Sequence, residues 1–423
     1  MANSKRAAQG AGNIRKHVVM RDGQSYTYWE ARVTVGTDAV TGKPVRRSFS
    51  GKTQKEVREK MQAAAVAVND GDYFEPSKMT LSRWLDIWLS EYTGDKKFLT
   101  VKHYKAQAKT HIKPSLGTVK LSELKPPQIQ AFYNELMRSG HKVPKYDEDG
   151  KIVKKDGKTV YEQIPMSAKS VRNIHGVLTK ALSTAVKVGY LKSNPAALVT
   201  LPKVQKKEIH PLTDEQVKAF LKEAEQDEYG IALRVILFTG LRESEAIGLT
   251  WDCVDFDTGE IKVCKQLQKR PAADGGFVFA PLKNDKTRVI KPAPFVMELL
   301  KIRRAEQAQQ CIAAGKLWTA WNSAAERKTA CVFTSALGDH LHPQTLYNHY
   351  KKITARIGLT DSRVHDLRHT FAVLSLQNGD DIKTVQGNLG HATAAFTLDV
   401  YGHVSERMKD ESAARMEKYI KAL

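Results

Sequence analysis

The segment between positions 364 and 404 constrains this chain more than any other. Three apolar residues recur there at helical spacing, namely Leu367, Phe371 and Leu374. This period predicts a helix with one buried face. His365, Arg368 and His369 stand three and four residues apart on another face of the same helix, so they can act together on one ligand.

A second helix and a tyrosine follow in the same segment. Asp380 or Asp381 caps the second helix, which ends at Gly390 and is followed at once by His391. Tyr401 stands at the end of a third, short helical segment. A cationic cluster, a histidine presented by a glycine and a tyrosine together predict a site where a phenol attacks an anion.

A zinc site is the alternative for two of these residues. His365 and His369 are four residues apart, which is a spacing that helical zinc motifs use. However, the glutamate of that motif is absent, and Arg368 would place a cation beside the metal. We therefore expect no metal ion and no cofactor.

The motifs, taken in order, resemble box II of the tyrosine recombinase (phage integrase) family. They read His-x-x-Arg, then Leu-Gly-His, then Tyr-Gly-His. Box I of that family is a Thr-Gly-x-Arg helix start, and the segment FTGLRESEAIGLTW supplies it with Arg242. The resemblance is closest to the integrases of conjugative transposons and prophages. The resemblance is clear in the C-terminal half of the chain and weaker in the rest.

The residue types then predict a phosphoryl-transfer reaction. Arg242 and Arg368 can each place a guanidinium fork on the oxygens of a phosphodiester, and they stay charged at any working pH. His391 and His365 can donate hydrogen bonds, and His365 can also help to deprotonate the phenol. Tyr401 attacks the phosphorus and becomes a 3′-phosphotyrosine.

A lysine and two supporting residues complete the predicted site. In the family, a lysine on the turn between the second and third of three antiparallel strands enters the active site. The pattern Lys-x-x-x-x-Arg assigns it to Lys283, and Lys286 is the alternative. Glu245 can orient a basic partner or form a surface ion pair of little energetic weight. His369 is expected to shape the helix end.

The charge of the chain points to a polyanionic partner. The 423 residues carry a formal net charge of +21, which alone would also suit a membrane surface or a ribosome. No apolar run reaches the length of a membrane span, and the first residues lack the apolar core of a signal peptide. The four cysteines show no paired spacing. We expect a cytoplasmic, nucleoid-associated bacterial protein with reduced thiols.

We predict a multidomain α+β fold. Residues 1–72 should form a basic arm and a small three-stranded sheet with one helix. Residues 77–202 should form a helical core-binding domain with a hairpin inserted at about 141–165. Residues 208–423 should form a mainly α catalytic domain with a small antiparallel sheet and a C-terminal tail helix.

The N-terminal region alternates apolar and polar residues from 17 to 49, which predicts a three-stranded meander, and Thr53 caps the helix after it. Arg32, Arg46 and Arg47 lie near the strands, which suits a sheet that enters a DNA groove. A structural domain with a solvated basic face is the alternative. The resemblance implies that this domain binds arm sites distant from the crossover.

The next region predicts four helices. One spans a tryptophan-rich stripe at 81–92, one is capped by Thr100, one starts at Pro126, and one starts at Ser167 or Ser170. The module resembles the core-binding domain of the family, whose basic side chains mainly contact phosphates.

Two further basic segments interrupt or follow this module. The insertion carries two Asp-Gly turn signals, which predict a hairpin. Its lysines could touch DNA or a neighbouring subunit, or the segment could be a solvated loop. Lys203, Lys206 and Lys207 belong to a basic linker that we expect to lie along the DNA backbone.

The sequence therefore predicts a site-specific DNA recombinase that integrates and excises a mobile element. Its expected partners are double-stranded DNA, with core and arm sites, and three further copies of the chain in a homotetramer on two duplexes. An excision factor is a potential additional partner. A type IB topoisomerase would use the same chemistry, but the separate N-terminal module favours the recombinase. A non-catalytic DNA-binding regulator would not need the complete set of site residues.

Overall fold

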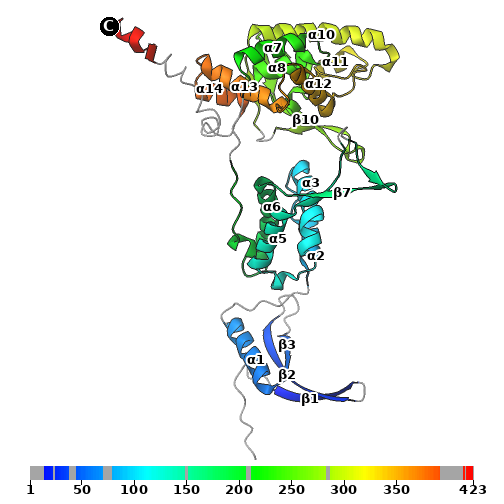
Figure 1. The fold of residues 1–423 in the computed structure, drawn as a ribbon, viewed down its shortest axis with the longest axis vertical. Helices are drawn as coiled ribbons and strands as arrows, with labels where there is room; N and C mark the ends of the chain where they lie inside the picture. Colours follow the sequence, from blue (N-terminus) through cyan, green and yellow to red (C-terminus); the bar gives the residue numbers. More distant parts are fainter. Residues whose placement is uncertain are drawn as a thin grey trace, which may run out of the picture. The chain divides into compact units, whose positions relative to one another are not determined.

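The structure is a computed structural model in which two compact units, residues 1–206 and 207–423, are described separately (Figure 1). Its mixture of helices and small antiparallel sheets confirms the predicted α+β fold class. In the described part of the chain, no helix is long and apolar enough to cross a membrane. The residues described are 14–21, 24–37, 44–69, 79–147, 151–205, 211–282, 286–390, 413–414 and 416–422.

The first unit begins with a three-stranded sheet and a helix that covers it. The strands pair antiparallel in the order β1-β2-β3. The buried side chains of Ala31 and Val33 on the sheet and Val57 on the helix make the contact between the layers. Thr53 caps the helix, because its hydroxyl accepts a hydrogen bond from the Glu56 amide at 3.2 Å. The predicted meander and helix are confirmed. The elements are β1 (Ile14–Arg21), β2 (Gln24–Thr37), β3 (Pro44–Gly51) and α1 (Gln54–Asn69).

A helical module with its own core follows in the same unit. Its helices are α2 (Leu81–Glu91), α3 (Phe98–Gln107), α4 (Lys113–Leu116), α5 (Pro126–Arg138) and α6 (Ala168–Lys187). The tryptophan-rich stripe of α2 is buried, as its spacing predicts. The indole of Trp84 donates a hydrogen bond to the carbonyl of Ala181 at 2.9 Å, which ties α2 to α6.

The helix starts in this module follow local capping chemistry, with one exception. Ser167 caps α6, since its hydroxyl accepts a hydrogen bond from the Ser170 amide at 3.2 Å. The prediction that Thr100 is a cap is wrong. The helix α3 begins two residues earlier, and the Thr100 amide already donates to the carbonyl of Lys97 at 2.8 Å. One π-helical turn, Ala108–Ile112, joins α3 to α4.

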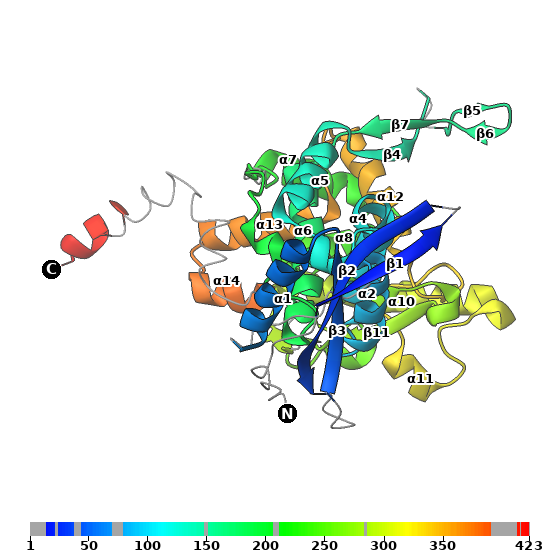
Figure 2. The same cartoon turned by 90° about the horizontal axis from the view of Figure 1, so that it is seen from below.

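Between α5 and α6 the chain forms two short antiparallel ladders. The outer one turns through Asp156 and Gly157, which both have positive φ as a type I′ hairpin turn requires. Figure 2 shows β4 and β7 leading from the helices to this outer hairpin. We name residues 141–164 the inserted arm. Its strands are β4 (His141–Pro144), β5 (Lys154–Lys155), β6 (Lys158–Thr159) and β7 (Tyr161–Ile164).

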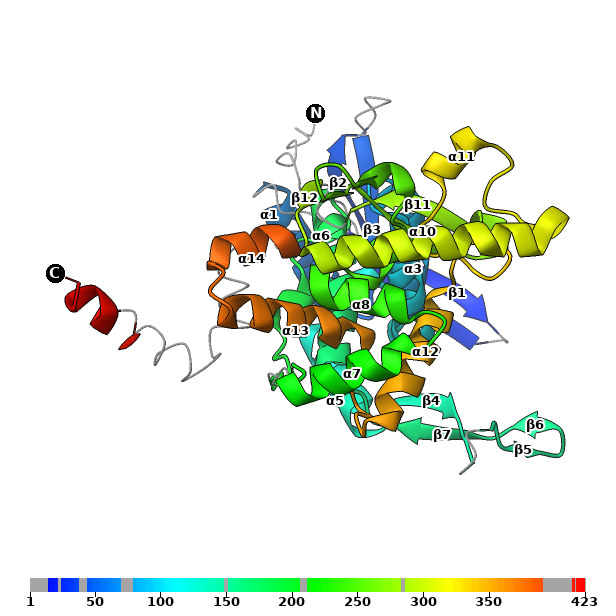
Figure 3. The same ribbon diagram turned by 90° about the horizontal axis from the view of Figure 1, so that it is seen from above.

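The second unit is built around the apolar helix α8. This helix is buried on nearly all sides, as expected of a helix without a polar face. It packs against α7, α10, α12 and α13 (Figure 3). The helices are α7 (Asp214–Glu225), α8 (Gly230–Thr239), α9 (Glu243–Ala246), α10 (Pro294–Ala314), α11 (Ala324–Thr329), α12 (Pro343–Arg356), α13 (Val364–Gln377) and α14 (Ile382–Leu389).

The strands of the second unit differ from the three that we predicted, because the described residues form five strands in two sheets. The predicted second strand is divided at Cys264, where the chain changes pairing partner: β9 pairs with β8 and β12, whereas β10 pairs with β11. The alternating pattern runs through this point, so it does not reveal the change. The strands are β8 (Val254–Asp255), β9 (Glu260–Val263), β10 (Lys265–Lys269), β11 (Phe277–Pro281) and β12 (Arg288–Ile290).

Candidate active site

A tight turn after α8 positions Arg242. The helix ends at Gly240, which has φ +64°, in the left-handed region that glycine adopts most easily. A Cβ atom at this glycine would lie 2.5 Å from the ring of Phe371 and 2.7 Å from Leu389. The turn therefore needs glycine both for its backbone and for the close approach of α13 and α14. Arg242 follows two residues later as the N-cap of α9.

The carboxylate of Glu245 is the centre of a buried ion cluster. It accepts hydrogen bonds from the Arg242 amide at 3.0 Å and from the Arg242 guanidinium at 2.7 Å. It also accepts two from the guanidinium of Arg288, at 2.7 Å and 3.3 Å. The Glu245 side chain is only 1% exposed, so it does not form the weak surface pair that was the alternative.

The charge of Glu245 is maintained by its two arginine partners. Burial by itself would raise the pKa of this carboxyl group. The hydrogen bonds and charges of Arg288 and Arg242 outweigh that effect and lower the pKa to about 2. Glu245 is therefore ionised at neutral pH, and the three side chains together carry a single positive charge.

Arg288 is a residue of this site that the sequence analysis missed. It lies on β12, and its Nε also donates to the carbonyl of Asn388 at 2.7 Å, which joins the strand to the end of α14. A Cβ atom at Gly390 would lie 3.0 Å from the Nη1 atom of Arg288. The available signal was the Lys-x-x-x-x-Arg pattern, which we used only to locate a lysine. Because β12 pairs with a strand distant in sequence, nothing local indicated that this arginine is buried.

Arg368 joins two helix ends. It is 1% exposed, and its two terminal nitrogens donate to the carbonyls of Gly240 and Leu389, both at 2.5 Å. The carboxyl ends of helices carry partial negative charge, which a guanidinium stabilises. The turn before Arg242 and the end of α14 are thus held together by one side chain. Arg242 adds a contact to the same place, with its Nη2 3.4 Å from the carbonyl of Gly390.

The two predicted histidines of α13 contact one another. The rings of His365 and His369 meet edge to face with centroids 4.7 Å apart. Burial, followed by the charge of Arg368, lowers the pKa of His365. Burial, followed by the neighbouring His365, lowers the pKa of His369 to about 4. Both rings are therefore neutral at physiological pH. In the described ranges, no group of three or more His, Cys, Asp or Glu side chains is placed to hold a metal ion.

Three of the predicted catalytic residues lie outside the described residues: Lys283, His391 and Tyr401. The alternative lysine, Lys286, is exposed two residues before β12. The structure thus brings together Arg242, Glu245, His365, Arg368 and His369 from the predicted set and adds Arg288.

The residues predicted to contact DNA lie mostly at the surface or outside the described residues. Arg32 and Arg46 are exposed on the N-terminal sheet, and Arg32 donates to the hydroxyl of Ser48 at 3.2 Å. Lys203 is exposed after α6. The side chain of Arg47, and the residues Lys206 and Lys207, lie outside what the structure describes.

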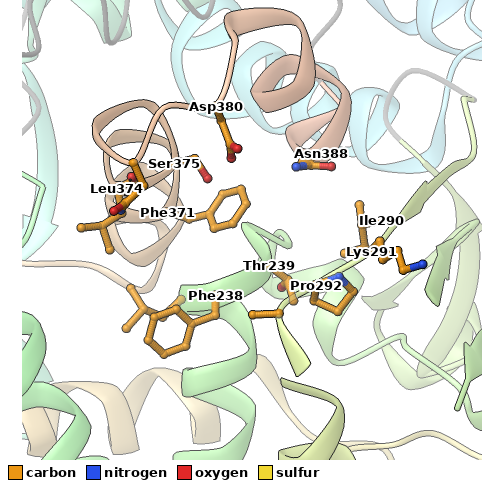
Figure 4. Close-up of a pocket in the computed structure, with 13 residues that line it drawn as sticks. Phe238, Thr239, Ile290, Lys291, Pro292, Phe371, Leu374, Ser375, Asp380 and Asn388 are labelled. Atoms are coloured by element: carbon orange, nitrogen blue, oxygen red, sulfur yellow. Dashed lines mark hydrogen bonds between the residues drawn. The ribbon is translucent and has the colours of Figure 1, made fainter. Parts of the chain in front are cut away.

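A largely apolar pocket opens beside the ion cluster, with a volume of about 310 Å³. Figure 4 shows Phe371 and Leu374 of α13 on one side and Phe238 and Pro292 on the other, with Asp380 nearby. An apolar hollow of this size is suited to receive a few aliphatic or aromatic side chains.

We expect Glu245→Gln to destabilise the second unit by about 3 kcal/mol, because it leaves the buried guanidinium of Arg288 and the partly buried one of Arg242 without their anion. The folded-state pKa of about 2 lies below the ordinary 4.5, so this stabilisation is complete above pH 4.5 and is lost as the pH falls toward 2. Urea unfolding of both proteins should show the difference in free energy of unfolding shrinking over that range.

The matched control is Glu298→Gln, because Glu298 forms an ion pair with Lys301 on an exposed helix face. It should change the free energy of unfolding by less than about 0.5 kcal/mol. Equal effects of the two substitutions at neutral pH would contradict the importance assigned to the buried cluster.

Two family models match the chain. The model described as "Phage integrase family" matches residues 210–408, and the model described as "Phage integrase, N-terminal SAM-like domain" matches residues 80–137. Together they span more than half of the chain, and the first includes every residue of the ion cluster.

Two relatives match this chain over nearly their whole length. A tyrosine recombinase XerC-like protein of Caldanaerobacter subterraneus subsp. tengcongensis is 28% identical, over 90% of this chain and 94% of its own. The ICEBs1 integrase of Bacillus subtilis is 24% identical, over 92% of this chain and 96% of its own.

Solved structures share the fold. The Tn1549 transposon integrase in complex with a circular intermediate DNA has a TM-score of 0.62 and 19% identity, over 81% of this chain and 99% of the other. A lambda integrase dimer bound to a COC′ core site has a TM-score of 0.52 and 18% identity, over 92% and 96%. The motifs, the fold and the family matches agree, and this chain belongs to the tyrosine recombinase (phage integrase) family.

Proposed function

We propose that this protein is a site-specific DNA recombinase, an integrase that inserts and excises a mobile element by cutting and rejoining DNA through a 3′-phosphotyrosine. The observation that carries the proposal is the preorganised cluster of Arg242, Glu245 and Arg288, which lies against the helix ends that Arg368 joins. Relatives named as integrases and tyrosine recombinases support the same activity. Double-stranded DNA is the substrate, in the bacterial cytoplasm.

Arg242 is the arginine best placed to meet the scissile phosphate. Its side chain is 23% exposed, whereas that of Arg288 is 9% exposed and Arg368 is 1% exposed. Glu245 holds the Arg242 guanidinium in place before DNA arrives, so little reorganisation is needed when negative charge builds on the phosphate oxygens. Arg368 can touch the phosphate only if the residues that cover it move. Otherwise it acts by holding the turn before Arg242.

The remaining steps of the proposed reaction use side chains that the sequence motifs supply. The phenol oxygen of Tyr401 attacks the phosphorus, and the bond to the 5′ oxygen breaks. His365, kept neutral, can accept the phenolic proton. We assign the proton for the departing 5′ oxygen to Lys283, with Lys286 as the alternative, and a hydrogen bond to the phosphate to His391.

The covalent bond to Tyr401 stores the energy of the phosphodiester, so rejoining needs neither ATP nor a metal ion. Attack by the 5′ hydroxyl of a second duplex exchanges strands, whereas attack by the original hydroxyl relaxes DNA as a type IB topoisomerase does. The separate N-terminal sheet favours strand exchange, because relaxation needs no second DNA-binding module.

The domain roles follow the same proposal. Residues 1–72 would bind arm sites through the sheet that carries Arg32, Arg46 and Arg47. Residues 77–202 would hold the core site, with the hairpin inserted at about 141–165. Residues 208–423 would carry the catalysis and the tail helix. The linker between the core-binding domain and the catalytic domain would follow the DNA backbone through Lys203, Lys206 and Lys207.

A finer part of the proposal is a homotetramer on two duplexes, with an excision factor as a potential additional partner. The tail exposes three apolar side chains at helical spacing, those of Met416, Tyr419 and Ile420, each more than half exposed. The pocket beside the ion cluster offers a complementary apolar surface (Figure 4). We propose that the tail of one subunit fills the pocket of the next.

Tyr401→Phe should bind DNA with unchanged affinity and form no covalent adduct, because only the phenol oxygen is removed. The measurement is a nicked suicide duplex followed by denaturing electrophoresis. Wild-type protein should form the adduct equally well in EDTA. An adduct at wild-type yield in the variant would place the nucleophile elsewhere, and loss of the wild-type adduct in EDTA would indicate a metal.

Lys283→Ala should cleave ordinary DNA about 10²–10⁴-fold more slowly, which is the usual value of a positioned proton donor. Sulfur in place of the 5′ bridging oxygen gives a leaving group that needs no proton, so this substrate should restore cleavage. Arg242→Ala is the control that the sulfur should not rescue, because its loss is charge stabilisation. Rescue of Lys286→Ala instead would show that Lys286 is the acid.

Ile420→Ser should weaken assembly while leaving cleavage at a single site intact, since it removes an apolar side chain from the tail. The complexes formed with two duplexes can be sized by analytical ultracentrifugation, beside a recombination assay. Lys418→Ser, on the same helix, is the matched control and should assemble normally. Normal assembly of Ile420→Ser would argue against the tail as the subunit contact.

A further inference from the structure

The inserted arm leaves the helical module from a fixed point. Gly140 has φ +66°, and a Cβ atom there would lie 1.5 Å from the carbonyl oxygen of Ile164, so the two ends of the arm touch at its base. The Met166 amide then donates to the carbonyl of Leu136 at 3.0 Å, which joins the start of the next segment to α5. The base of the arm is thus anchored to the helices that it interrupts.

Backbone hydrogen bonds continue beyond the base. After β4 and β7 pair, the Lys145 amide donates to the carbonyl of Val160 at 2.8 Å. The Val153 amide donates to the carbonyl of Lys145 at 2.8 Å, and the Val160 amide donates to the carbonyl of Val153 at 2.9 Å. The β5–β6 hairpin follows (Figure 2). The described residues of the arm therefore form a ribbon of paired strands.

This ribbon has no core of its own. None of the side chains described in it is buried. An isolated two-stranded ribbon is only marginally stable in water without a surface to pack on. The arm is therefore suited to pack against the surface of a binding partner.

The tip of the arm is strongly basic. Residues 151–159 read KIVKKDGKT, with four lysines and one aspartate. The side chains of Lys154, Lys155 and Lys158 are exposed, and the side-chain amine of none of the three forms an ion pair or hydrogen bond with another described residue. Most of the acidic residues of the arm come earlier in its sequence, at positions 147–149. Positive charge is thus concentrated on the β5–β6 hairpin.

We propose that the β5–β6 hairpin binds the sugar-phosphate backbone of the DNA duplex beyond the stretch held by the helical module. The proposal rests on the proposed function, in which the chain acts on DNA. A two-stranded ribbon is narrow enough to lie along or enter a major groove. Lysines are depleted from protein–protein interfaces, so a tip that presents three of them favours DNA over a second subunit. The matched family model ends at residue 137, before the arm begins.

Contacts between lysines and phosphates lengthen the stretch of DNA that the protein covers, but they do not make binding more sequence-specific. Lysine meets phosphate as a point charge, and phosphate contacts set position and affinity rather than the reading of bases. The hairpin would therefore strengthen binding to any duplex long enough to reach it.

The test compares the full-length protein with a variant in which Lys154, Lys155 and Lys158 are all alanine. The measured quantity is the slope of log K against log salt concentration. Each phosphate contact contributes about 0.9 to that slope, so three contacts contribute about 2.7. The slope should fall by about this amount on a duplex that extends well past the core site, and should not change on one trimmed to the core.

The matched control replaces the same three lysines by arginine, which keeps the charge and should keep the slope. Adduct formation on a nicked core duplex should be normal in all three proteins, which shows that the variants fold. An unchanged slope on the long duplex would overturn the proposal. So would normal DNA binding combined with loss of the tetramer, which would assign the hairpin to a subunit contact. Failure of the wild-type protein to form any adduct would instead contradict the proposed function.

Discussion

The active unit depends on one buried carboxylate between two arginines. Burying a charge is costly unless it is paired and fully hydrogen-bonded, and Glu245 meets that condition with four hydrogen bonds from Arg242 and Arg288. The cluster keeps a net positive charge in a site where water is largely excluded. In the proposed function such a site would attract a phosphate, while the carboxylate of Glu245 keeps the two guanidinium groups in place. Fixed charge can then do the work that metal ions do in other phosphoryl-transfer sites.

The same cluster explains why helix ends, rather than helix faces, build the site. The carboxyl ends of α8 and α14 leave carbonyl groups without partners inside their helices, and Arg368 satisfies one from each region, at Gly240 and Leu389. Arg288, which lies on β12, donates to a further carbonyl, that of Asn388. Segments separated by a hundred residues or more are therefore joined by guanidinium groups. Gly240 and Gly390 both have positive φ; a Cβ atom at Gly240 would meet the side chains of Phe371 and Leu389, and one at Gly390 would press on the guanidinium of Arg288.

Sequence reasoning located the parts of this site that depend on local signals. The glycine of the Thr-Gly-x-Arg motif, the cap at Asp381 (one of two candidates) and the helical spacing of His365 and Arg368 are all encoded within a few residues. It missed Arg288, because burial of that side chain depends on the pairing of β12 with β9, which alternation cannot reveal. The division of one predicted strand at Cys264 has the same cause. Lys283 and Tyr401 lie outside the described residues, so their roles stay predictions from the motifs.

The arginines also determine what the histidines can do. Burial, and then the positive charge of Arg368 and Arg242, disfavours a protonated ring, so the pKa of His365 is lowered and the ring stays neutral. A neutral ring can accept a proton, whereas a charged one cannot. When a phosphate enters, its negative charge offsets that of the arginines and makes protonation of His365 easier. In the proposed reaction, the charge that would bind the substrate thus helps to keep His365 neutral beforehand, and the substrate itself would favour the transfer of the proton to His365.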